Sequence, residues 1–112
     1  MAEQIEIGDF ARVEMRVGRV TAAEDFPKAR KPSYRLTVDF GPIGIRSSVA
    51  ALKTDYRLDE LPGRQVVAVV NFPPRRIAGF DSEVLILAAT EAGGALRLLS
   101  PDPAAELGSL IT

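Results

Sequence analysis

The segment from residue 72 to residue 80 carries the side chains best suited to holding a ligand. It reads Phe-Pro-Pro-Arg-Arg-Ile-Ala-Gly-Phe, so that Phe72 and Phe80 flank Arg75 and Arg76. Aromatic rings beside guanidinium groups suit stacked bases, phosphates and extended peptides. The two prolines stiffen the segment, which lowers the entropy lost on binding. We therefore predict a peptide-binding site formed by Phe72, Arg75, Arg76 and Phe80; a rigid connection with two solvated arginines is the alternative.

Further basic side chains could bind the phosphates of RNA. Lys28, Arg30 and Lys31 lie in a stretch of the sequence, residues 26–38, that contains no acid. Arg35 and Arg46 fall on the polar faces of two predicted strands. The predicted RNA-binding set is Lys28, Arg30, Lys31, Arg35, Arg46, Arg75 and Arg76. Solvated loops and an ordinary solvated sheet face account for these charges equally well.

The composition argues against catalysis. The 112 residues include no histidine and no cysteine, which removes the commonest general base, the commonest metal ligand and any thiolate site. The sequence has no glycine-rich phosphate loop, nucleophile elbow or zinc-protease motif. Asp59 and Glu60 are adjacent, and adjacent side chains in a helical turn point apart. We expect no enzyme, no metal and no cofactor.

The location of the protein is predicted from its first residues and its apolar runs. The beginning of the chain has neither the basic nor the apolar region of a secretory signal. No apolar run approaches the roughly 20 residues of a membrane-spanning helix. The lack of cysteine fits a reducing compartment. We expect a cytoplasmic protein without membrane insertion, folded as a single domain over residues 1–112.

Hydrophobic periodicity predicts a small β-barrel. In the clearest strand, apolar and polar residues alternate strictly from Tyr34 to Phe40. In the first strand the parity changes around Gly18 and Arg19, which predicts a bend that lets one strand serve both sides of a barrel. The runs at 66–70 and 84–89 are continuously apolar, which is typical of central strands covered on both faces. The five expected strands cover about 15–24, 34–40, 43–48, 65–71 and 82–90.

Two short helices are expected outside these strands. Asp9 is placed to cap one near the start of the chain. The other is expected within residues 48–61, where apolar residues recur at helical spacing before Pro62 and Gly63 end the segment. Residues 72–80 are expected to form an extended, unpaired loop because their prolines disfavour strand pairing.

This order of three strands, a helix and two strands is that of the OB-fold, a five-stranded Greek-key barrel. The barrel is expected at about 13–90, and a small sandwich or an SH3-like barrel is the alternative. In an OB-fold the loops after the first strand and before the last strand frame the ligand face. Both predicted basic segments fall on those loops, so we expect them to flank one face.

The end of the chain carries apolar residues that need a partner surface. A sixth short strand is expected at 95–99, followed by a break at Pro101 and Pro103. Beyond it, Leu107, Leu110 and Ile111 are apolar at a chain end, where disorder is usual. Packing on the chain's own barrel and packing across a dimer both fit this pattern.

Several segments resemble those of a known family. Residues 14–20, Glu-Met-Arg-Val-Gly-Arg-Val, resemble the opening of the tRNA-binding OB domain that is appended to methionyl-tRNA synthetase. Residues 26–31 resemble the His-Pro-Lys-Ala-Asp-Lys stretch of that family, and residues 77–89 its Leu-Arg-Gly-x-x-Ser segment. Residues 71–85 are more specific, and they resemble CsaA, the stand-alone, secretion-related chaperone branch of the family. The resemblance covers about residues 9–103.

The resemblance implies an OB-fold homodimer, joined through its terminal segments, that binds unfolded or precursor polypeptides for export. The alternative that it implies is a tRNA-binding or RNA-binding module. Phe26 stands where the tRNA-binding members carry His, and Arg30 stands where they carry Asp, which favours the chaperone branch. The net charge of −1 is also low for an RNA-binding domain.

Overall fold

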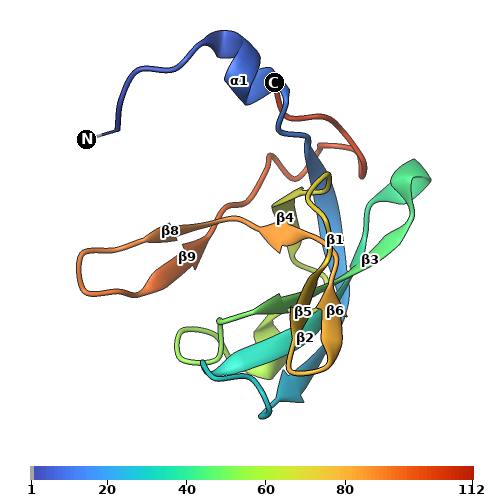
Figure 1. Cartoon of the computed structure of the whole chain (residues 1–112). Helices are drawn as coiled ribbons and strands as arrows, with labels where there is room; N and C mark the ends of the chain where they lie inside the picture. Colours follow the sequence, from blue (N-terminus) through green and yellow to red (C-terminus); the bar gives the residue numbers. More distant parts are fainter. Residues whose placement is uncertain (1) are drawn as a thin grey trace.

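The polypeptide curls into an antiparallel sheet that closes on itself. In the computed structural model, which describes residues 2–112, five strands are hydrogen-bonded in the order β3-β2-β1-β4-β7 (Figure 1). They are β1 (Met15–Phe26), β2 (Ser33–Asp39), β3 (Ile45–Ala50), β4 (Gln65–Val69) and β7 (Leu85–Ile86). The all-β OB-fold predicted from the hydrophobic pattern is confirmed.

β1 serves both halves of the barrel, as predicted. Residues 15–19 pair with β4, whereas residues 19–26 pair with β2. A Cβ atom at Gly18 would lie 2.6 Å from Val38 and 2.7 Å from the Phe40 ring, so only glycine allows the core to approach the strand here. The register shift itself falls between Val20 and Ala22, just after the predicted position.

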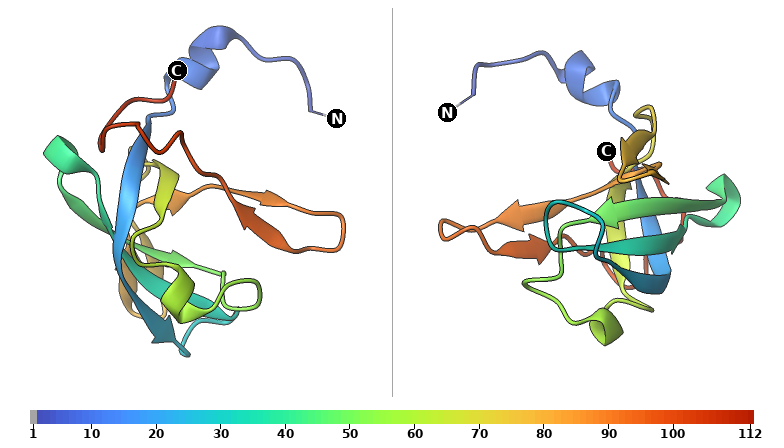
Figure 2. Two further views of the ribbon diagram at one scale, coloured as in Figure 1. Left: turned by 180° about the vertical axis from the view of Figure 1, so that it is seen from behind. Right: turned by 60° about the horizontal axis from the view of Figure 1, so that its bottom comes forward.

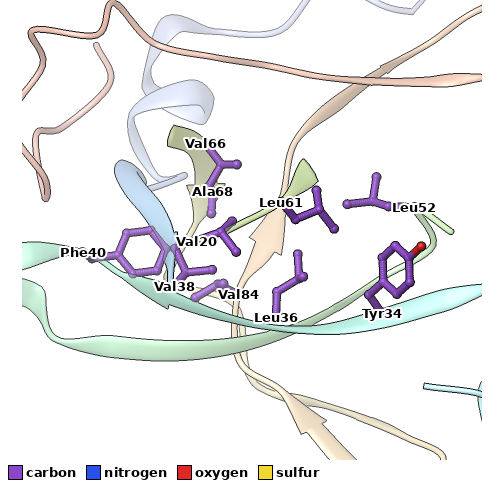
Figure 3. Close-up of a cluster of buried hydrophobic side chains, with 10 residues drawn as sticks. All are labelled: Val20, Tyr34, Leu36, Val38, Phe40, Leu52, Leu61, Val66, Ala68 and Val84. Atoms are coloured by element: carbon purple, nitrogen blue, oxygen red, sulfur yellow. The ribbon is translucent and has the colours of Figure 1, made fainter. Parts of the chain in front are cut away.

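The core fills the concave side of the sheet. The apolar residues that alternate from Tyr34 to Phe40 are at most 5% exposed, which confirms the predicted face of β2. β4 is buried on both faces, as its continuous apolar run predicts. Figure 3 shows the ten buried side chains that meet in this cluster. They are Val20, Tyr34, Leu36, Val38, Phe40, Leu52, Leu61, Val66, Ala68 and Val84.

β3 is joined to residues 82–84 largely through side chains, which completes the barrel. We call Ser47, Ser48, Ser82 and Glu83 the closure seam. The hydroxyl of Ser48, which is 1% exposed, donates to the carbonyl of Val84 at 3.0 Å. The Ser82 hydroxyl accepts the N–H of the residue after Ser48 at 2.9 Å. One carboxylate oxygen of Glu83 accepts both the N–H and the hydroxyl of Ser47, each at 2.9 Å.

The predicted strand at 82–90 is wrong in its extent and burial. It is divided between β7, which pairs with β4, and β8 (Ala88–Thr90), which pairs with β9 (Leu96–Leu98) in a protruding hairpin (Figure 1). The partner changes at Leu87, whose N–H donates to Val67 and whose carbonyl accepts Leu99. Leu85 is 42% exposed, so this run is not covered on both faces.

The predicted unpaired loop at 72–80 is also wrong. β5 (Arg75–Ile77) and β6 (Phe80–Ser82) form an antiparallel hairpin. Both prolines precede β5, so they remove no hydrogen bond from its ladder. Ala78 and Gly79 have φ angles of 50° and 84°, which match the right-handed twist that a two-residue hairpin turn requires.

The helical segments differ from the prediction in position and length. α1 (Ile7–Ala11) begins before Asp9, whose carboxylate accepts the N–H of Glu6 at 3.1 Å from within the first turn. Residues 48–50 continue β3, and the only helical turn in the predicted helix is η2 (Leu58–Glu60).

β3 also begins two residues later than predicted. The short helical turn η1 (Gly41–Ile43) occupies the connection between β2 and β3. No helix in the described part of the chain has the length and hydropathy needed to cross a membrane.

The C-terminal segment packs on the chain's own barrel. The backbone groups of residues 108–111 bond to β1 opposite β4, with Gly108 donating to Val17 at 2.8 Å and Ile111 donating to Met15 at 2.9 Å. The C-terminus therefore lies beside α1 at one end of the barrel (Figures 1 and 2). Packing on the chain's own barrel and packing across a dimer were the two predicted alternatives for this tail, and its backbone follows the first. The Leu110 side chain is nevertheless 50% exposed.

The closure seam predicts the effect of one small substitution. Ser48→Ala removes the hydroxyl that donates to the carbonyl of Val84, and the buried carbonyl is left without this partner. We expect the free energy of unfolding to fall by about 1–3 kcal/mol. Urea denaturation measures this change, and Ser100→Ala at an exposed position is the control, with an expected effect within about 0.5 kcal/mol. Equal stabilities of the two variants would show that the hydroxyl does not support the seam.

Candidate ligand-binding groove

One groove collects most of the residues that the sequence marked as binding candidates. It has a volume of about 880 Å³ and lies between three segments: the loop from β1 to β2, the β5–β6 hairpin and the β8–β9 hairpin. Its basic residues are Lys28, Arg30, Lys31, Arg75 and Arg76. The two basic segments, more than 40 residues apart in the sequence, thus flank one face as predicted from the OB-fold.

The floor and far wall of the groove are apolar. Leu85 and Ile86 of β7 and Leu96 and Leu98 of β9 line it, together with Ile77 of β5. The apolar run at 84–89 was predicted to be a strand covered on both faces, so this floor was not identified from the sequence. The apolar run was visible, but its pattern alone does not distinguish a buried strand from one that lines an open groove.

The positive charges on the rim are largely unpaired. Arg76 is bonded to Asp81 across the β5–β6 hairpin, with 2.9 Å between the guanidinium nitrogen and the carboxylate oxygen. Within residues 2–112, Lys28, Arg30, Lys31 and Arg75 form no ion pair. They are therefore free to donate hydrogen bonds to the carboxylate, phosphate or carbonyl oxygens of a ligand.

The remaining predicted site residues lie outside the groove lining. Phe72 is 47% exposed, just before the β5–β6 hairpin. Phe80 packs against Arg35, whose guanidinium carbon is 3.6 Å from the centre of the Phe80 ring. Arg46 bonds to the carbonyl of Ile45 at 3.2 Å, near the β2–β3 connection.

The β8–β9 hairpin is fixed to the barrel by the segment that follows β3. The Asp55 carboxylate accepts the N–H of Leu96, and the Tyr56 hydroxyl accepts the N–H of Leu98, each at 3.0 Å. The hydroxyl of buried Tyr34 donates to the Tyr56 carbonyl at 2.8 Å. These bonds connect the far wall of the groove to the core, so the width of the groove is set by the barrel.

One charged pair lies outside the groove lining. On the β8–β9 hairpin, a hydrogen bond from Arg97 to Glu91 and the charge of that carboxylate raise the pKa of Arg97 above its ordinary value. Among residues 2–112 no three carboxylates are grouped closely enough to hold a metal ion.

A second, smaller cavity of about 460 Å³ lies at the end of the barrel where α1 and the C-terminal segment meet. α1 and the C-terminal segment line it, including Ile7, Phe10 and Leu110. These three side chains are 84%, 37% and 50% exposed, and Ile5 nearby is 72% exposed. These exposed apolar residues of α1, of the segment before it and of the C-terminal segment are called the terminal patch below: Ile5, Ile7, Phe10 and Leu110.

Several solved structures share this fold. The chaperone CsaA from Bacillus anthracis superposes with a TM-score of 0.92 at 43% identity, over 98% of this chain and all of that one. The chaperone CsaA from Picrophilus torridus gives a TM-score of 0.91 at 44% identity, over 97% of this chain and all of that one.

Sequence comparison finds relatives in a different set of proteins. The chain is 39% identical over 99% of its length to the methionine–tRNA ligase of Porphyromonas gingivalis, of which it covers 16%. It is also 39% identical over 97% of its length to the enzyme of Methanococcus vannielii, again covering 16%. The chain thus spans about a sixth of these relatives. The family model described as "Putative tRNA binding domain" matches residues 15–110, and the chain belongs to this tRNA-binding domain family.

Proposed function

We propose that this protein is a cytoplasmic, non-enzymatic chaperone that binds unfolded or precursor polypeptides for export. The observation that carries the proposal is the apolar floor of the groove beneath a basic rim. Binding sites for organic ligands are typically concave and apolar, with a few charged groups that fix orientation. The two CsaA chaperones that share this fold support the same function.

An unfolded polypeptide offers the groups that this groove can bind. Its apolar side chains would contact Leu85, Ile86 and Ile77, while its carbonyls and acidic side chains would accept hydrogen bonds from Arg75 and Arg76. Phe72 would extend the apolar contact beyond the groove, and Phe80 would act by holding the hairpin in place.

A charge placed on the floor tests the polypeptide-binding proposal. Leu85→Asp puts a carboxylate among the apolar side chains, and because Leu85 is 42% exposed the fold should tolerate it. We expect affinity for an unfolded polypeptide to fall by about tenfold, the order of one lost apolar contact. Fluorescence anisotropy with a labelled, unfolded client measures the affinity, and suppression of client aggregation provides a second measurement.

Ile45→Asp is the matched control for this variant. Ile45 is also an exposed apolar strand residue, at 63%, but it lies outside the groove. Polypeptide binding should remain at the wild-type level in this variant. If Leu85→Asp folds and binds the client as tightly as Ile45→Asp does, the groove is not the polypeptide site.

We propose tRNA binding at the same rim as a second candidate function. The favouring observation is a group of cations that form no ion pair in the described part of the chain, on a member of the tRNA-binding domain family. They are Lys28, Arg30, Lys31 and Arg75. Arg35 and Arg46 were assigned to this function from the sequence, but they lie outside the groove lining. Affinity for tRNA should be weak and should fall steeply with salt, because few phosphates are contacted.

Arg75 and Arg76 should contribute unequally to tRNA binding. Arg75→Gln removes an unpaired charge, so the slope of log affinity against log salt should become shallower by about one. Arg76→Gln should change the slope less, since Asp81 already neutralises part of that charge. Binding assays between about 50 and 200 mM salt measure both slopes. Arg57→Gln, outside the groove, serves as the control, and equal slopes for all variants would rule out Arg75 as a phosphate contact.

We also propose that the protein is a homodimer joined through the terminal patch. α1 has five residues, none of them buried, and isolated helices this short are unstable in water. A second copy placed by a twofold axis would cover both terminal patches with the same contacts. Each dimer would then offer two grooves to one long unfolded chain, which increases avidity.

Substitution of the terminal patch tests the dimer. Ile7→Asp combined with Leu110→Asp places charges on two exposed side chains and leaves the backbone bonds of residues 108–111 intact. We expect the double variant to be monomeric at concentrations where the wild type is dimeric, as measured by sedimentation. A wild-type protein that sediments as a monomer, or a double variant that stays dimeric, would contradict the proposed interface.

A further inference from the structure

Arg35 and Phe80 form a stack on the outside of the barrel. Arg35 projects from the outer face of β2, and its guanidinium carbon lies 3.6 Å from the centre of the Phe80 ring. The same carbon is 5.8 Å from the centre of the Phe26 ring. The two rings are 6.0 Å apart and inclined at 58°, so the three side chains form one cluster.

The charge of Arg35 has few polar partners. Its buried Nε has no hydrogen-bond partner among the described residues. Glu24 lies directly opposite on β1, yet no ion pair joins the two residues. The Phe80 ring is thus the principal contact of this guanidinium group. It covers the flat face of the group, on which another aromatic ring could otherwise stack.

A stacked nucleic acid base would need the position that Phe80 occupies. Bases of single strands stack on aromatic rings and on arginine, and in OB-folds the outer surface of the second and third strands is where oligonucleotides bind. Phe80 reaches this surface because the β5–β6 hairpin folds over it. The hairpin is held by the Ser47 hydroxyl, whose single proton is shared between the Asp81 carbonyl and the Glu83 carboxylate, each at 2.9 Å. The ring belongs to the same chain, so it occupies the position without the entropy cost of association.

We infer that Phe80 is a specificity-determining residue that excludes single-stranded RNA from Arg35 by filling the base-stacking position itself. This inference rests on the proposed function, because the exclusion of RNA by Phe80 would favour the binding of polypeptides in the groove. Phe26 contributes by supporting the Phe80 ring from the side. Arg35 is then not a free phosphate contact in the wild-type protein but a covered one.

Removal of the ring should uncover the site. We expect Phe80→Ala to bind a single-stranded oligouridylate of about ten nucleotides roughly tenfold more tightly than the wild type, the order of one stacked base. The slope of log affinity against log salt should also become steeper by about one, since Arg35 becomes available to a phosphate. Affinity for an unfolded polypeptide should not increase. Fluorescence anisotropy with each labelled ligand gives all three values.

A second substitution identifies Arg35 as the cause of the gain. In the Phe80→Ala background, Arg35→Gln should return oligouridylate affinity to the wild-type level. Leu58→Ala, which truncates another partly exposed apolar side chain outside the groove and the stack, should show no gain. Thermal unfolding checks that each variant is folded. Phe80→Leu replaces Phe80→Ala if the latter does not fold, because it keeps apolar volume against Phe26 but has no ring to stack on Arg35.

The inference is wrong if folded Phe80→Ala or Phe80→Leu binds oligouridylate no better than the wild type, or if the gain persists without Arg35. The proposed function is tested separately by the wild-type protein in the same assay. A wild type that fails to bind unfolded polypeptide would overturn the proposed function, whereas an Arg35-dependent gain in RNA binding would still support the role of Phe80.

Discussion

The barrel closes largely through side chains where a continuous strand ladder is missing, and the candidate groove depends on that closure. Ser48 is almost completely buried, and its hydroxyl satisfies a carbonyl across the seam. Glu83 uses one carboxylate oxygen to bond both polar hydrogens of Ser47. The Ser47 hydroxyl oxygen also lies 2.9 Å from the carbonyl oxygen of Asp81 and shares its single proton between the two acceptors, so the closure seam holds the base of the β5–β6 hairpin as well. Each polar group here needs its partner, because an unsatisfied buried group destabilises the fold.

The same closure leaves an apolar surface uncovered. After the seam the chain pairs with β4 over only two residues and then turns away into the β8–β9 hairpin. Leu85 and Ile86 therefore have barrel on one side and open groove on the other. A floor of this kind, together with a rim on which four of the five cations form no ion pair within the described residues, suits a ligand that is apolar along its length and polar at intervals, such as an unfolded polypeptide. On the proposed functions, polypeptide and tRNA would compete because the same rim binds both.

Three aromatic and basic side chains control access to the neighbouring sheet face. Phe80 lies on Arg35, and Phe26 lies beside both. The stack orders the β5–β6 hairpin, which carries Arg75 and Arg76 to the rim of the groove. A single cluster thus positions the rim and covers the cation that a base would use.

The sequence by itself determined the features that arise from local patterns. Strict alternation from Tyr34 to Phe40 identified β2, the run at 66–70 identified β4, and the two basic segments fell on the loops that flank one face. Local periodicity reflects which face of a strand is buried, so these predictions needed no distant contact. Only the tertiary structure decided that Phe80 stacks on Arg35 and that Leu85 lines a groove. An apolar run has the same pattern in a core strand as in a groove, and its exposure depends on partners that lie far away in the chain.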